Sequence, residues 1–166
     1  MKKQYLAYFL ILIELVIQIA GGIYYDQTPG FVWALANAIL IMVPLAFGVK
    51  LGLLCLLPAA VSETVWFFLL NYTPGPLFHL VSFTVSVIIL GFANKKLNQM
   101  PKLRRILLSI LLYFLFLFAE EALYHSLMLL FLNRTLTWKK VSETFLSPVN
   151  LLLLPVLFLG EEHNSM

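Results

Sequence analysis

Four glutamates stand inside long apolar runs of this chain: Glu14, Glu63, Glu120 and Glu121. A carboxylate at the centre of a bilayer costs about 2.5–3.5 kcal/mol on insertion scales, so such groups usually face a bundle interior or a partner. They could bind a ligand, carry a proton or contact a partner protein. They could also be structural, because hydrogen bonds between membrane helices each contribute about 0.6 kcal/mol on average. The sequence leaves both interpretations open.

Other polar residues recur at helical spacing beside these glutamates. The sets are Glu14 with Gln18, Glu121 with His125, and His79 with Ser82 and Ser86. Residues three or four apart lie on one face of a helix, so the members of each set are expected to share a face. For Gln18 and the serines we favour hydrogen bonding between helices over a role in a functional site. Asn150 is a further polar candidate, at the start of the last apolar run.

Metal binding and covalent catalysis have little support in the sequence. Glu120, Glu121, His125 and His79 are possible ligands, but no HExxH-type spacing occurs. A serine or cysteine nucleophile with a histidine base matches no motif, and glycine-rich phosphate loops are absent. We therefore predict no metal, no cofactor and no catalytic residue.

The elements that carry these side chains are predicted to be membrane helices. The chain has 166 residues, of which 61% are hydrophobic and 11% charged, whereas soluble domains carry about 25% charged residues. This composition excludes a soluble domain and a nucleic-acid-binding protein. One membrane helix needs about 20 apolar residues, so we predict an all-α membrane protein with a single six-helix bundle over residues 1–166. The helices are expected at about 5–23, 31–47, 51–70, 77–93, 106–132 and 146–159.

The last predicted helix is short and contains Pro148 and Pro155. The stretch 133–145 before it is amphipathic and is expected to form a short helix at the membrane interface. Small residues spaced by four occur at Ala34 and Ala38 and at Gly48 and Gly52, and such spacing allows helix backbones to pack closely.

Basic residues predict the orientation in the membrane. Six crossings place both termini on one side, together with eight basic residues: Lys2, Lys3, Lys50, Lys95, Lys96, Lys102, Arg104 and Arg105. Three basic residues, Arg134, Lys139 and Lys140, remain on the other side. The positive-inside rule then predicts that both termini lie in the cytoplasm.

The order of features along the chain resembles the rod shape-determining protein MreD family. A short basic start precedes the first helix, a glycine-spaced turn joins the second and third, and an acidic residue stands late in the third. The segments that carry the resemblance are Leu15–Gln18, Pro29–Leu45, Gly48 with Gly52, Glu63, Pro74–Leu77, the acidic fifth helix and Phe145–Leu151. The resemblance implies a non-enzymatic scaffold of the cell-wall elongation machinery that binds a bitopic MreC-type partner within membrane lipid. Glu63, Pro74–Leu77 and Asn150 would then be structural or partner-facing.

Two further resemblances compete with this one. The length, the six spans and the Gly48/Gly52 turn are similar to the substrate-binding S components of energy-coupling-factor vitamin transporters, whose partner is an energy-coupling module. In this chain Ala34 and Ala38 fall on the second helix, whereas those proteins often carry such a pair on the first. Glu120, Glu121 and His125 also faintly resemble the Glu-Glu-x-x-x-Arg motif of CAAX-type intramembrane proteases, with histidine in place of arginine.

Overall fold

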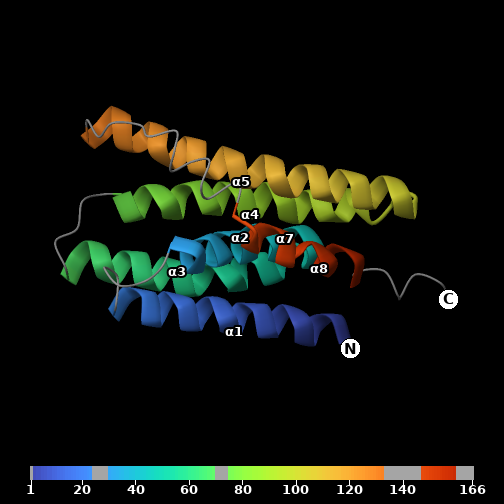
Figure 1. Cartoon of the computed structure of the whole chain (residues 1–166), viewed down its shortest axis with the longest axis horizontal. Helices are drawn as coiled ribbons and strands as arrows, with labels where there is room; N and C mark the ends of the chain where they lie inside the picture. Colours follow the sequence, from blue (N-terminus) through green and yellow to red (C-terminus); the bar gives the residue numbers. More distant parts are fainter. Residues whose placement is uncertain (1, 24–29, 70–74, 133–146, 160–166) are drawn as a thin grey trace.

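The computed structural model describes residues 2–23, 30–69, 75–132 and 147–159, and over these residues the chain is helical. The helices are α1 (Lys2–Ile23), α2 (Gly30–Phe47), α3 (Val49–Leu69), α4 (Gly75–Leu97), α5 (Lys102–Leu132), α7 (Val149–Leu152) and α8 (Leu154–Leu159). Figure 1 shows α1 to α5 lying side by side with alternating direction. The predicted all-α class is therefore confirmed for the described part of the chain.

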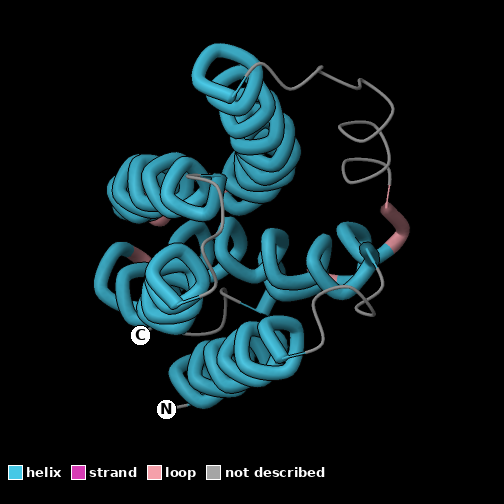
Figure 2. The backbone as a smooth tube through the Cα atoms, turned by 90° about the vertical axis from the view of Figure 1, so that its left-hand side faces the viewer, coloured by secondary structure: helices cyan, strands magenta, loops and turns pink. Residues whose placement is uncertain are grey.

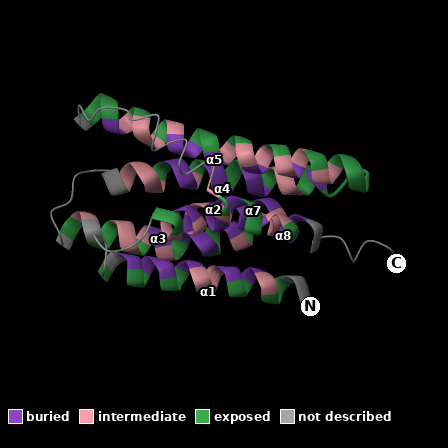
Figure 3. Ribbon diagram, viewed as in Figure 1, coloured by how far each residue is buried: buried purple, intermediate pink, exposed green. Residues whose placement is uncertain are grey.

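Helix α2 forms the centre of the bundle. It packs against α1, α3, α4 and α5, and also against the short helices α7 and α8. Ala34, Ala36 and every residue from Ala38 to Leu45 are buried, which Figure 3 shows as a largely purple ribbon. The end-on view in Figure 2 shows the other long helices grouped around it. The close packing of α2 explains why alanines occupy Ala34 and Ala38, since small side chains allow neighbouring helices to approach.

The outer surface of the long helices is apolar. Large hydrophobic side chains are exposed along α1 (for example Phe9, Leu12 and Val16) and along α5 (for example Leu107 and Leu111). Four described stretches are long and apolar enough to cross a membrane: Gln4–Gly21, Gly30–Phe47, Leu77–Leu97 and Lys102–Phe131. Because a soluble protein would hide such surfaces from water, this outer face fits a membrane protein.

The turn between α2 and α3 consists of a single residue, Gly48. Its φ of 90° lies in the left-handed region, where a side chain would be strained. The Asn94 side chain of α4 donates a hydrogen bond of 2.7 Å to the carbonyl oxygen of Leu45, which satisfies a backbone acceptor at the end of α2. The α2–α3 turn is thus fixed to α4.

Two glycines allow the helices around this turn to approach closely. A Cβ atom built on Gly52 would lie 2.6 Å from the Cβ of Pro44, so α3 packs directly on α2 at this point. A Cβ built on Gly91 of α4 would lie 2.5 Å from the Cα of Val49. Side chains at Gly52 and Gly91 would therefore force the helices apart.

The prediction of one continuous helix over 146–159 is wrong. Ser147 and Pro148 are not helical, and the helix from Val149 is interrupted at Leu153 between α7 and α8. Pro155 causes the interruption, because it has no backbone N–H to donate to the carbonyl of Leu151 and its ring crowds that carbonyl. Neither α7 nor α8 is long enough to cross a bilayer. The amphipathic segment 133–145 lies outside the described residues.

The basic residues of the described helices gather at one end of the bundle. Helix α1 begins and α8 ends at this end, on the right in Figure 1. The start of α3, the last turn of α4 and the start of α5 lie there too, with Lys50, Lys95, Lys96, Lys102, Arg104 and Arg105. Helix α4 continues to Leu97, beyond the predicted end at 93, and α5 begins at Lys102 instead of 106. Lys95 and Lys96 in the last turn of α4 stabilise this extension through the helix dipole.

Candidate functional site

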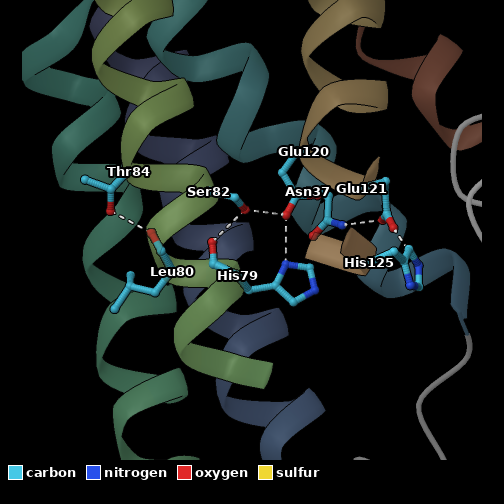
Figure 4. Close-up of polar contacts among 8 residues, drawn as sticks. All are labelled: Asn37, His79, Leu80, Ser82, Thr84, Glu120, Glu121 and His125. Atoms are coloured by element: carbon cyan, nitrogen blue, oxygen red, sulfur yellow. Dashed lines mark hydrogen bonds and ion pairs between the residues drawn. The ribbon is translucent and has the colours of Figure 1, made fainter. Parts of the chain in front are cut away.

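Buried and half-buried polar side chains of α2, α4 and α5 form one cluster, which we call the α4–α5 cluster. It consists of Asn37, His79, Ser82, Glu120, Glu121 and His125, and Figure 4 shows these side chains turned toward one another. The five members predicted from the sequence thus lie together. Asn37 is the sixth member, and sequence reasoning missed it.

Glu120 links α5 to α4. Its Oε1 atom lies 2.9 Å from Nδ1 of His79 and accepts a 2.9 Å hydrogen bond from the hydroxyl of Ser82. The Ser82 hydroxyl also lies 3.0 Å from the backbone oxygen of His79. Glu120 and Ser82 are 2% and 1% exposed, so this contact is shielded from the surroundings. Charge-assisted hydrogen bonds are stronger than neutral ones, particularly where the dielectric constant is low.

The imidazole ring of His79 stacks with two aromatic rings. Its centroid lies 3.7 Å from that of Tyr124 on α5 and 5.7 Å from that of Phe83 on its own helix. Stacking and the contact with Glu120 fix the ring orientation together. His79 is therefore a positioned group and not a freely rotating one.

Glu121 links α5 to the central helix α2. The amide nitrogen of Asn37 donates to Oε1 of Glu121 at 3.2 Å, and Nε2 of His125 lies 3.5 Å from Oε2. Asn37 and Glu121 are 84 residues apart in the chain. Each glutamate of the Glu120–Glu121 pair thus contacts a different neighbouring helix.

The local sequence of α5 explains this division of partners. Adjacent residues point about 100° apart on a helix of 3.6 residues per turn, so Glu120 faces α4 while Glu121 faces α2. Tyr124 follows Glu120 by four residues and shares its face, and His125 follows Glu121 in the same way. The dipeptide therefore directs two carboxylates, each with an aromatic or imidazole neighbour, toward two different helices.

A second polar group, the α1 pair, consists of Glu14 and Gln18. Their exposed fractions are 0% and 5%, and Nε2 of Gln18 donates a 2.7 Å hydrogen bond to Oε1 of Glu14. The hydroxyl of Ser62 on α3 lies 3.5 Å from the backbone oxygen of Gln18. Glu14 Oε2 and Gln18 Oε1 have no hydrogen-bond partner among the described residues.

Glu63 on α3 interacts electrostatically with both polar groups. It is half-buried, and its charge acts on Glu14 of the α1 pair and on His79 and Glu120 of the α4–α5 cluster. The four glutamates of the described helices thus belong to one polar region inside the bundle.

Asn150 has a different position. It is buried on α7, and the hydroxyl of Tyr113 donates a 3.1 Å hydrogen bond to its backbone oxygen. Tyr113 lies two turns of α5 before Glu120, and this contact attaches α7 to the bundle. Ser86 is buried on α4, one turn beyond Ser82. Within the described helices, no group of three or more His, Cys, Asp or Glu side chains is arranged to hold a metal ion.

Comparison of the chain with protein-family models, with curated proteins and with solved structures gives no match.

Proposed function

We propose that this protein is a non-enzymatic scaffold of the bacterial inner membrane, similar to the MreD family, that binds an MreC-type bitopic partner of the cell-wall elongation machinery. The order of sequence features supports this proposal. The observation that carries it concerns the partners of the two α5 carboxylates, which all belong to the same bundle. Glu120 contacts Ser82 and His79. Glu121 contacts Asn37 and His125. Their oxygens stabilise the helix packing, and the apolar outer surface is what the protein offers to a membrane partner.

The same proposal includes the topology: the chain crosses the membrane six times and has both termini in the cytoplasm. Helix α3 has 21 residues and lies against both α2 and α4, so it is proposed as a crossing beside the four apolar stretches. Helices α7 and α8 run toward the end at which α1 begins (Figure 1).

Affinity isolation from bacterial membranes tests the scaffold function. The full chain, tagged at one terminus and extracted in mild detergent, is expected to isolate with a single-span protein of the cell-wall machinery. Depletion of the protein should make rod-shaped cells round. An ATPase-bearing transport module in the isolate, with normal cell shape after depletion, would contradict the proposal.

Vitamin binding as an S component is the second candidate. It is favoured by the convergence of polar side chains from α1 to α5 inside the bundle, because ligand sites of helical bundles are built from facing helices. His79 and His125 retain partial side-chain exposure. Saturable binding of a small vitamin to the purified protein would support this candidate, and no binding across a broad panel would exclude the vitamins tested.

The basic residues at one end of the bundle predict the orientation of the protein in the membrane. Replacing Lys95, Lys96, Lys102, Arg104 and Arg105 by glutamine is expected to produce a mixture of two orientations, because lysine and arginine near the membrane retain loops in the cytoplasm. Reporter fusions to the C-terminus measure the change. Asn98→Gln, an uncharged substitution at an exposed position between α4 and α5, serves as the control. An unchanged orientation in the fivefold variant would remove the argument for cytoplasmic termini.

A further inference from the structure

The α1 pair contains two buried oxygen atoms that lack a partner. Glu14 is completely buried and Gln18 is 5% exposed. Their mutual hydrogen bond uses Nε2 of Gln18 and Oε1 of Glu14. Glu14 Oε2 and Gln18 Oε1 remain without a hydrogen bond to any described residue. A buried polar atom normally has a partner, so these two atoms need an explanation.

A second carboxyl group contributes negative charge near Glu14. The carboxyl group of Glu63 on α3 interacts electrostatically with Glu14, and Glu14 in turn interacts electrostatically with the thiol of Cys55 on α3. Helix α2, the other helix packed against α1, has no titratable side chain between Gly30 and Phe47. The described groups around Glu14 thus include a second carboxyl group.

The chemistry of the missing partner follows from these contacts. An ionised carboxylate and an amide oxygen are both acceptors, so the partner must be a hydrogen-bond donor or a cation. An uncompensated charge in a low-dielectric interior is strongly unfavourable, and a second carboxylate nearby makes it more so. Because Glu14 is fully enclosed, a partner's side chain or an organic ligand would have to open the bundle. The partner must therefore be small.

We propose that Glu14 and Gln18 form an intramembrane binding site for one small cation, held by Glu14 Oε2 and Gln18 Oε1, with Glu63 as the second carboxyl group. The cation is either a proton or a sodium ion. A proton on Glu14 makes the carboxyl group neutral and supplies the donor that Gln18 Oε1 lacks. A sodium ion takes both oxygens as ligands. The site is independent of the scaffold function proposed above.

The test compares the thermal unfolding of the purified full-length chain in neutral detergent with that of Glu14→Gln. NaCl, KCl and choline chloride are used at equal ionic strength, each over a series of pH values. A bound cation stabilises the folded state by mass action, so the wild-type midpoint should rise by about 2–4 °C or more with sodium or with falling pH. Glu14→Gln is neutral and carries its own donor, so its midpoint should no longer depend on either cation. Glu120→Gln removes a carboxyl group that has partners in the structure, so it is the matched control for sodium and should keep the wild-type rise. Ser126→Ala leaves every titratable group in place, so it is the control for pH.

Infrared difference spectra decide the case in which Glu14→Gln fails to fold or the wild type responds to neither cation. A carboxylic-acid carbonyl band of the wild type that shifts in Glu14→Asp identifies a bound proton. Where Glu14→Gln folds, the same band should be absent from its spectrum. A rise in the midpoint with sodium but not with potassium or choline identifies sodium. The proposal is overturned if Glu14→Gln keeps the wild-type dependence, or if the wild type responds to neither cation and lacks such a band.

Discussion

Replacing Gly91 by leucine is expected to lower the free energy of unfolding by about 1–3 kcal/mol or more, the usual range for overpacking. A Cβ at this position would lie 2.5 Å from the Cα and 2.7 Å from the backbone nitrogen of Val49. Backbone atoms cannot rotate away as a flexible side chain can, so α4 must separate from α3. Thermal unfolding in detergent or nanodiscs measures the loss.

The control for this prediction is Gly30→Leu. A Cβ on Gly30 meets nothing within 4 Å, so the added side chain enters open space at the start of α2. Equal stability of Gly91→Leu and Gly30→Leu would show that α3 and α4 do not approach as closely as described.

Replacing Glu120 by leucine is expected to destabilise the bundle by about 1–3 kcal/mol, because it leaves buried partners without an acceptor. The hydroxyl of Ser82 and Nδ1 of His79 both contact Oε1 of Glu120. Adding His79→Phe should recover part of the loss, since phenylalanine keeps a ring that can stack with Tyr124 and Phe83. A double-mutant cycle over these positions is expected to give a coupling energy of about 0.6–1.7 kcal/mol.

Ser126→Ala on the same helix is the control for the cycle. Ser126 is exposed and its hydroxyl contacts the carbonyl oxygen of Ala122 within α5, so its removal should change stability by less than about 0.5 kcal/mol. A coupling energy near zero would mean that His79 and Glu120 do not stabilise each other.

The helices could be predicted from the sequence because their apolar runs are long and their breaks contain glycine and proline. The predicted ends of α1, α2 and α3 lie within about three residues of the observed ones. The ends of α4 and α5 were harder to predict. Lys95, Lys96 and Lys102 are polar, yet they remain helical, because long basic side chains can leave the apolar layer while their backbone stays in a helix.

The contacts within one helix were also accessible from the sequence. Gln18 meets Glu14, and His125 approaches Glu121, as a spacing of four predicts. Contacts between helices were not accessible in this way. His79 and Glu120 are 41 residues apart, and which faces of α4 and α5 meet depends on the packing of the whole bundle.

Asn37 shows why one member of the α4–α5 cluster was missed. It is a single uncharged amide in the otherwise apolar run of α2, and an amide carries a weaker signal than a glutamate or histidine. The signal that could have found it is its place in a continuous apolar helix, where any polar side chain needs a partner. Pro155 was visible in the sequence, but the division of the last helix at Leu153 required the structure.

The central position of α2 has a consequence for biosynthesis. Asn37 emerges from the ribosome 84 residues before Glu121, which at about 5–20 residues per second corresponds to roughly 4–17 s. Helix α2 must therefore enter the lipid before α4 and α5 exist to surround it. Only α1 and α3, which lie next to it in the chain, can shelter the nascent helix, and the amide of Asn37 reaches its carboxylate when α5 is inserted.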